Sequence, residues 1–260
     1  MRPRVSVILC AYNEEACIAR AIDSILDQTF DDLEIIAVND GSTDNTLEVL
    51  RKYADRRLTV INKANTGLTD SLNVGIRASQ GELVARLDAD DWADKRRIEI
   101  QVQFLDSNPQ IALVGTWASI VKPDGCVETC KLPVSSAKIR RFMLRDNPFV
   151  HSSVLMRRTV FDEVGWYRST HGMEDYDLWI RIAARYPTAN IAECLVTRYM
   201  NHHHFSTRPF YSGLSMYDMY SRRLSCQWYA ARTLGTGIIA VPHLFKTLLQ
   251  LGLCRLGLLT

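Results

Sequence analysis

Short apolar runs alternate with amphipathic runs through the first ninety residues, and this order constrains the fold more than any other feature of the chain. The apolar runs end in turn-forming residues, which predicts short buried strands rather than long helices. Strands that alternate with helices predict an α/β fold with a mostly parallel sheet flanked by helices. Ligands of such sheets collect at the carboxyl ends of the strands. The predicted strands are 5–11, 34–38, 58–62 and 83–87, and the predicted helices are 14–26, a run from about 44, and 71–78.

The second half of the chain is less regular and predicts two parts. A length of 260 residues suits one α/β domain with an appendage. We predict a domain over residues 1–206 and a basic, amphipathic helical tail over 207–260. The further predicted elements are strands 111–117 and 153–158, helices 136–144 and 174–186, and tail helices at about 213–232 and after Pro242.

Charge is distributed unevenly between these two parts. The whole chain carries a formal charge of +2, which argues against a nucleic-acid partner. From residue 207 onward there are six basic residues and one acid, a net charge of +5, which leaves −3 for the rest. Apolar helical faces with interspersed cations suit contact with an anionic membrane. They equally suit packing on the α/β domain or on a second subunit of an oligomer, and the sequence leaves these alternatives open.

Cysteine usage and the N-terminus bear on the cellular compartment. The seven cysteines are scattered, form no CxxC pair and are odd in number, which fits a reducing compartment better than a disulfide framework. We read no signal peptide at the N-terminus, and no window of 18 residues is both apolar and uncharged. These features predict a cytoplasmic protein, with the basic tail allowing contact with the inner face of the membrane.

Acidic residues occur where two predicted strands end and where a later helix begins. Asp40 follows the second strand, Asp88 and Asp90 follow the fourth, and Glu174 and Asp175 open the helix at 174–186. Turns favour aspartate, and helix N-termini favour acids, so each cluster alone also has a structural explanation. Together they point to one edge of the sheet. Two carboxylates near a phosphate are typical ligands of Mg²⁺, which neutralises charge on a leaving diphosphate.

The chain resembles family 2 glycosyltransferases, which are inverting enzymes with the GT-A fold and serve bacterial polysaccharide synthesis. The resemblance runs from about residue 4 to residue 206 and rests on six segments in order. These segments are 5–15, 39–44, 65–75, 85–101, 147–153 and 174–181.

The resemblance implies a hexosyltransferase reaction at these residues. A sugar would move from a UDP-sugar to a hydroxyl of a glycan or lipid-linked glycan, with Asp175 as the general base. Asp40 would accept a hydrogen bond from the uracil ring, and Asp90 would bind Mn²⁺ or Mg²⁺. The implied nucleotide and donor-sugar residues are Ala11, Tyr12, Glu14, Asp40, Gly67, Asn73, Arg86, Asp88 and Ala89, and the implied acceptor residues are Glu174, Trp179 and His151.

One segment departs from the family pattern. Family members often have a Tyr-Arg-x-His segment after the catalytic helix, and its histidine can complete the metal site. Here the corresponding stretch places Asn201 at that position, with His202 one residue later. We predict His202 as the further metal ligand, with a polar loop near the donor phosphates as the alternative.

Three other functions compete with this one. A metal-dependent phosphohydrolase would also use acids at a strand end, but it needs an aspartyl nucleophile after the first strand, where this chain has Cys10, Ala11 and Tyr12. A dinucleotide-dependent oxidoreductase would need a GxGxxG motif after that strand, which is missing. A catalytically inactive nucleotide-sugar binding protein is the third, and the joint presence of Asp40, Asp90 and Asp175 argues against it.

Overall fold

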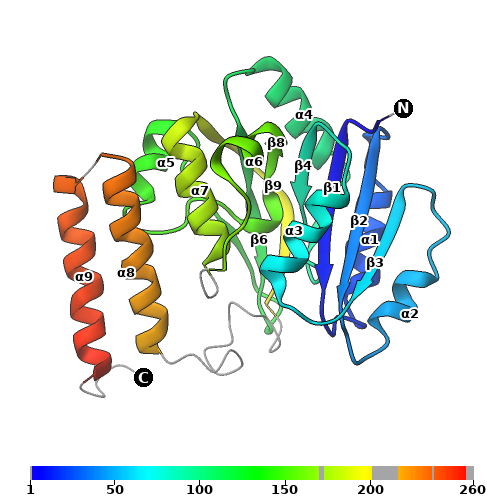
Figure 1. The fold of residues 1–260 in the computed structure, drawn as a ribbon, viewed down its shortest axis with the longest axis horizontal. Coiled ribbons are helices and arrows are strands. Elements are labelled where there is room, and N and C mark those ends of the chain that lie inside the picture. The colour runs from blue at the N-terminus through cyan, green and yellow to red at the C-terminus, as the bar shows by residue number, and fades with distance from the viewer. Residues whose placement is uncertain (1, 170–172, 201–215, 236, 256–260) are drawn as a thin grey trace.

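A single mixed sheet organises the protein. The computed structural model describes residues 2–169, 173–200, 216–235 and 237–255. Its nine strands lie in the order β3-β2-β1-β4-β8-β6-β9-β5, and β7 pairs with β6 (Figure 1). The strands are β1 (Val5–Ala11), β2 (Leu33–Asp40), β3 (Leu58–Lys63), β4 (Leu83–Arg86), β5 (Trp92–Ala93), β6 (Leu113–Val121), β7 (Val127–Cys130), β8 (Leu155–Arg157) and β9 (Thr188–Tyr199).

The first half confirms the predicted parallel βα arrangement. Strands β3, β2, β1 and β4 are parallel neighbours, and Val5 of β1 lies opposite both Leu33 of β2 and Leu83 of β4. Every residue of β1 is buried, as expected for a strand covered on both faces. The helices of this half are α1 (Ile18–Leu26), α2 (Thr46–Arg51) and α3 (Leu68–Ala78).

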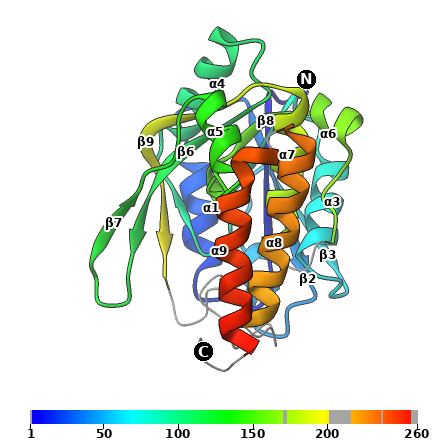
Figure 2. The ribbon, with the colours of Figure 1, turned by 90° about the vertical axis from the view of Figure 1, so that its left-hand side faces the viewer.

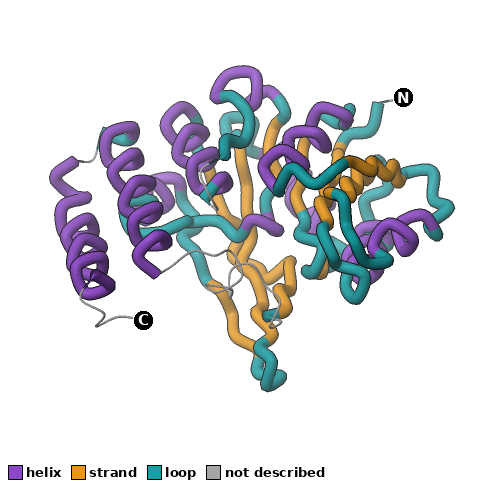
Figure 3. Tube along the Cα trace, turned by 60° about the horizontal axis from the view of Figure 1, so that its bottom comes forward, coloured by secondary structure: helices purple, strands orange, loops and turns teal. Residues whose placement is uncertain are grey.

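Alternate residues of β1 belong to two different cores. Val7 and Leu9 pack with α1, whereas Ile8 and Cys10 pack with α3. The period of two along the strand therefore separates the helices onto opposite faces of the sheet, as the tube in Figure 3 also shows. Helix α1 begins at Ile18 rather than at the predicted 14, and α3, which begins at Leu68, contains the predicted helical residues 71–78.

The second half completes the sheet with both strand directions. Strand β8 is antiparallel to β4 and β6, while β6 and β9 run parallel with a bulge after Thr116. Strands β6 and β7 form a hairpin that projects from the body (Figure 2). The predicted strand at 153–158 is shorter, because residues His151–Ser153 form a 3₁₀ turn. The helices are α4 (Arg97–Ser107), α5 (Ser136–Phe142), α6 (Thr159–Val164) and α7 (Glu174–Arg185).

The predicted tail forms a helical hairpin on the α7 side of the molecule. Helix α8 (Met216–Thr233) lies between α7 and α9 (Gly237–Arg255) in Figure 1. Cys226 and Ala230 of α8 belong to the same apolar core as α7. The helix predicted after Pro242 begins earlier, because Pro242 lies inside α9 near its start. None of the described helices is long and apolar enough to cross a membrane.

Candidate functional site

The ends of β1, β2 and β4 bring the predicted nucleotide residues to one edge of the sheet. Ala11 is the last residue of β1 and is buried, so only its backbone can face a ligand. Burial raises the pKa of the Cys10 thiol to about 12. The charges of Arg86, Asp88 and Asp40 lie close enough to shift this pKa as well. Asp40 and Asp88 therefore flank the end of β1, as the sequence predicted.

Two loops at this edge are joined by reciprocal hydrogen bonds. Asn13 is the one described non-glycine residue with a positive φ (56°). Its side-chain oxygen accepts a bond from the Thr43 backbone amide at 2.8 Å, and its backbone amide donates to Ser42 Oγ at 3.0 Å. Asp44 accepts from the Thr46 and Glu15 amides and caps α2. These bonds fix the loop that carries Tyr12, which is 48% exposed, and the predicted donor residue Glu14.

Asp40 is the centre of a polar network and exposes 4% of its surface. Its carboxylate accepts bonds from the Lys63 ammonium, from the Thr66 amide at 3.0 Å and from the Gly67 amide at 2.9 Å. Burial opposes ionisation, but Lys63 and the Thr66 amide outweigh it and lower the pKa of Asp40. Gly67 has φ of 92°, which favours glycine. Asp40 thus orders the loop at 64–67 and keeps little accessible surface for contact with a nucleobase.

Asp88 is held as a carboxylate by an ion pair with Arg86. Arg86 Nη2 lies 2.5 Å from Asp88 Oδ1, and Ser152 Oγ donates to Asp88 Oδ2 at 2.7 Å. Burial opposes ionisation of Asp88, but the Arg86 guanidinium outweighs it and holds the pKa of this carboxyl well below its usual range. Arg86 itself is 3% exposed, which leaves its side chain little surface for the predicted contact with the donor. Its role in the structure is to position Asp88.

Ser152 also joins Asp88 to a second, fully buried acid. Burial, with the charge of Asp88, raises the pKa of Asp91 well above its usual value, and Arg198 Nε lies 3.8 Å from Asp91 Oδ2. The Ser152 hydroxyl lies within hydrogen-bonding distance of both Asp88 Oδ2 and Asp91 Oδ2, and its single proton can be donated to one of these carboxyl oxygens at a time. Ala89, in the loop between these two acids, is buried and can present only backbone.

Asp90 lies in this loop between Asp88 and Asp91, and Arg20 of α1 holds its backbone. Arg20 Nη2 donates to the Asp90 carbonyl at 2.5 Å. The same guanidinium lies 3.8 Å from the centre of the Tyr199 ring at the end of β9. Arg20 therefore connects α1, the loop of residues 88–91 (the acidic loop) and β9. It was not predicted as a site residue.

The first turn of α7 brings two more acids towards this edge. Asn147 Nδ2 donates to Asp175 Oδ2 at 2.7 Å, and the Tyr176 amide donates to Asp175 Oδ1 at 2.7 Å. Each carboxylate oxygen keeps a lone pair for another proton donor. Glu174 is buried, and burial together with the Asp175 charge raises its pKa to about 7.

His151 and Tyr167 lie between the acidic loop and α7. His151 Nε2 is 3.1 Å from the Tyr167 hydroxyl. Burial and the nearby Arg86 lower the pKa of His151, which also senses the carboxylates of Asp88 and Asp175. Burial raises the pKa of Tyr167, and the same two carboxylates and Glu174 raise it further. The acids that follow β4 and those that begin α7 thus shift the pKa values of the same two side chains, His151 and Tyr167.

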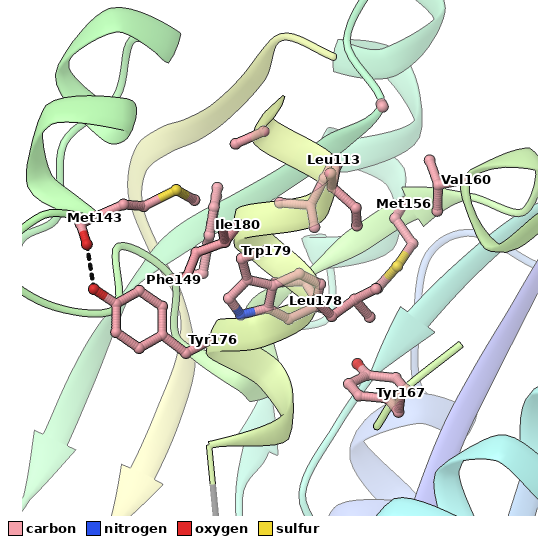
Figure 4. Packing of buried hydrophobic residues seen from close by; sticks show 14 of the residues in the cluster. Leu113, Met143, Phe149, Met156, Val160, Tyr167, Tyr176, Leu178, Trp179 and Ile180 are labelled. Carbon is pink, nitrogen blue, oxygen red and sulfur yellow. Dashed lines mark hydrogen bonds between the residues drawn. The ribbon is translucent and has the colours of Figure 1, made fainter. Parts of the chain in front are cut away.

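Asn73 and Trp179 have structural partners that the sequence did not indicate. Asn73 Nδ2 donates to the Tyr167 carbonyl at 3.0 Å, and its Oδ1 accepts from the Tyr167 amide at 3.1 Å. Trp179 is fully buried, so it can serve the acceptor only as an anchor beneath the site. Its ring packs edge-on against Phe149, with ring centres 5.9 Å apart, and lies near Tyr167 (Figure 4). The centre of the His151 ring is 6.1 Å from that of Trp179.

The acids that follow β4 are the candidate ligands for a cation among the described residues. Among them, no three His, Cys, Asp or Glu side chains lie close enough together to hold a metal ion alone. His202, the predicted further ligand, lies outside the described residues. Asp88 and Asp90 offer the hard oxygen donors that Mg²⁺ and Mn²⁺ prefer, and a bound diphosphate would supply the remaining oxygens. The donor set therefore fits a cation that binds together with a phosphate ligand.

The raised pKa of Glu174 predicts a pH-dependent stability. Between about pH 4.5 and 7 the folded protein keeps a proton that the unfolded chain has released, so this group lowers stability as pH rises. Glu174→Gln removes that cost. We expect the variant to gain on the order of 1–3 kcal/mol of unfolding free energy at pH 8 and nothing at pH 4. Urea unfolding at both pH values measures this, and Glu48→Gln, an exposed acid in the first turn of α2, should change neither.

The sequence model of Glycosyl transferase family 2 matches residues 6–165, more than half of the chain. An uncharacterized glycosyltransferase of Haemophilus influenzae is 37% identical over 208 residues, which cover 75% of this chain and 64% of that protein. The chain thus spans less than two thirds of that relative. The amylovoran biosynthesis glycosyltransferase AmsE of Erwinia amylovora is 33% identical over 197 residues, or 74% of each chain.

Solved structures agree on the fold at low sequence identity. S. aureus TarS 1–349, in a complex with UDP-GlcNAc, has a TM-score of 0.70 at 17% identity over 90% of this chain and 70% of its own. The mannosyltransferase PcManGT of Pyrobaculum calidifontis, with GDP-Man and Mn²⁺, has a TM-score of 0.65 at 18% identity over 95% and 74%. The fold is GT-A, and the chain belongs to Glycosyl transferase family 2.

Proposed function

We propose that the protein transfers a sugar from a UDP-sugar to an acceptor hydroxyl with inversion at the anomeric carbon. The observation that carries this proposal is the placement of Asp175 at the start of α7. Asn147 orients the Asp175 carboxylate, and the charges of Asp175 and Asp88 both shift the pKa values of His151 and Tyr167. A diphosphate near Asp88 and Asp90 would therefore leave its sugar between the acidic loop and Asp175.

In the proposed reaction Asp175 takes the proton from the acceptor hydroxyl. The acceptor oxygen forms a bond to the anomeric carbon as the bond from that carbon to the diphosphate oxygen breaks, and the bonding electrons leave with UDP. The transition state resembles an oxocarbenium ion. A lone pair remains on each Asp175 oxygen for this proton, because one N–H group, from Asn147 or from Tyr176, donates to each oxygen.

The proposed cofactor is Mn²⁺ or Mg²⁺, held by Asp90 with Asp88 nearby and with the donor phosphates. When bound, the cation would neutralise the charge that develops on the leaving diphosphate. Asp88 is kept ionised by Arg86, which suits a group that faces a cation. His202 stays a proposed further ligand, and the Mn²⁺ in the PcManGT complex lends support to a divalent ion here.

We propose a uracil base for the donor because Asp40 and its loop offer polar groups at the end of β2. Asp40 would act with the loop at 64–67 that it orders, since most of its own hydrogen-bonding capacity is used within the protein. Tyr12 is exposed enough to lie against a base. The UDP-GlcNAc complex of TarS favours this donor, and the GDP-Man complex of PcManGT makes GDP the alternative.

We propose a growing glycan, free or lipid-linked, as the acceptor, with Glu174 and His151 near it. The role of AmsE in amylovoran biosynthesis supports polysaccharide assembly as the setting.

A nucleotide screen tests the proposed donor and metal together. Calorimetric titrations of UDP, GDP, TDP and CDP are run with and without Mn²⁺. We expect UDP to bind most tightly and Mn²⁺ to increase its affinity by at least about tenfold. Release of phosphate from UDP under the same conditions would instead favour a phosphohydrolase, and metal-independent binding would contradict the proposed cofactor role.

Arg20 provides a sharper test of how the acidic loop is held. Arg20→Ala removes the bond to the Asp90 carbonyl, so we expect the Mn²⁺-dependent part of UDP affinity to fall about tenfold. UDP affinity without metal should not change. Tyr199→Phe keeps the ring beneath the guanidinium and serves as the control, with parental values. Equal losses with and without Mn²⁺ would show that Arg20 acts on the fold rather than on the metal loop.

A further inference from the structure

Helix α9 carries an apolar stripe that nothing in the described part of the chain covers. Nine large apolar side chains are exposed among the described residues, and five of them lie on α8 and α9. Four of these are on α9, at spacings of four, three and one residues, so they share one side of the helix. They are Val241 (59% exposed), Phe245 (67%), Leu248 (53%) and Leu249 (57%).

The opposite side of α9 is fixed to α8. Leu244 is buried, and the Thr247 hydroxyl donates to Gln227 Oε1 at 2.8 Å. Helix α8 is in turn tied to the body, where Gln227 Nε2 donates to the Arg145 carbonyl at 2.9 Å and Arg223 pairs with Asp146 at 2.7 Å. The hairpin therefore holds the stripe in a fixed orientation at the edge of the molecule, outside α8 (Figures 1 and 2).

Cations border the stripe, and α9 contains no acid. Lys246 and Arg255 are exposed on α9, and Arg232 is exposed near the end of α8. Over residues 216–255 there are five basic residues and one acid, Asp218. A second copy of the chain packed on this stripe would bring its own Lys246 and Arg255 to the same border, with no carboxylate on α9 to pair with them. A surface of anionic lipid headgroups complements this charge pattern.

We infer that the outer face of α9 docks on an anionic lipid bilayer, lying in the plane of its surface. Phe245, Leu248 and Leu249 would enter the boundary between headgroups and acyl chains, and Lys246 and Arg255 would contact the headgroups. Because α8 covers the inner side, α9 enters only with its outer face. This docking is independent of the proposed donor and of the general base.

Flotation of the full-length protein with vesicles tests the inference. We expect binding to phosphatidylcholine vesicles that contain about one third phosphatidylglycerol, and little binding to phosphatidylcholine alone. The double variant Phe245→Ser, Leu249→Ser should bind at least about tenfold more weakly. Lys246→Gln with Arg232→Gln should weaken binding and reduce its salt dependence.

A matched control separates this stripe from exposed apolar surface in general. Val127→Ser changes a side chain of β7 that is 61% exposed and should leave vesicle binding at the parental level. UDP titration of every variant reports whether the fold is intact. Failure of the parent to float with anionic vesicles, or parental binding by the Phe245, Leu249 variant, would overturn the inference. A dimer that this variant dissociates, with no effect on vesicles, would assign the stripe to a second copy instead.

Discussion

Asp175→Asn is expected to bind UDP and Mn²⁺ with near-parental affinity and to lose transfer by about 10²–10⁴-fold. The change replaces the basic carboxylate at the start of α7 with an uncharged amide of nearly the same size. Because the general base acts on the acceptor and not on the nucleotide, the loss should appear in the rate and not in donor affinity. Calorimetry measures the affinity, and release of UDP from a UDP-sugar with acceptor measures the rate.

The control for this prediction is another acid in the first turn of a helix. Glu48→Gln in α2 tests whether removing a negative charge from a helix N-terminus matters by itself, and it should retain full activity. Transfer by Asp175→Asn at the parental rate would remove Asp175 from the base role. Loss of UDP binding in that variant would mean that the residue serves the donor or the fold.

Asp90→Ala is expected to abolish the effect of Mn²⁺ on UDP binding and to reduce transfer by at least about 10³-fold. The proposed cation supplies several kcal/mol of stabilisation to the leaving diphosphate, and each 1.4 kcal/mol corresponds to tenfold in rate. UDP affinity measured without metal should stay close to that of the parent. Binding of Mn²⁺ followed by electron paramagnetic resonance, with and without UDP, gives a readout that does not depend on turnover.

Asp27→Ala is the matched control, because Asp27 is an exposed carboxylate at the end of α1 and outside the acidic loop. It should leave both the metal effect and transfer unchanged. Persistence of the Mn²⁺ effect in Asp90→Ala would place the cation on other ligands.

The parallel half of the fold could be predicted because its signals are local. Each residue of β1 is buried, so the strand reads as an apolar run interrupted only by Ser6, and the helices between strands have clear turn residues before them. Strand β9 was missed because the middle of its sequence, around Glu193, is exposed, and the strand exists only through its pairing with β6. The start of α9 was misplaced because Pro242 was taken as a boundary, whereas it lies within the helix.

The site residues divide in the same way. Polar residues at strand ends could be placed from order alone, because parallel strands end at one edge. Burial could not be inferred: Arg86 and Trp179 carry the motif but support it from inside the protein. Asn147 and Ser152 lie in the resembling segment 147–153 and Arg20 lies outside the resembling segments, but a positioning role could not be assigned to any of them, because their partners lie 28, 64 and 70 residues away along the chain.

The central claim is that one site, at the carboxyl edge of the parallel strands, holds cation, diphosphate and general base together. A crystal structure with UDP and Mn²⁺, read through the anomalous signal of manganese, tests it most directly. We predict a manganese peak about 2 Å from an Asp90 carboxylate oxygen and from the UDP phosphates, with Asp175 facing the side where the sugar would be attached. UDP bound elsewhere, or Asp175 facing away from the diphosphate, would contradict the account.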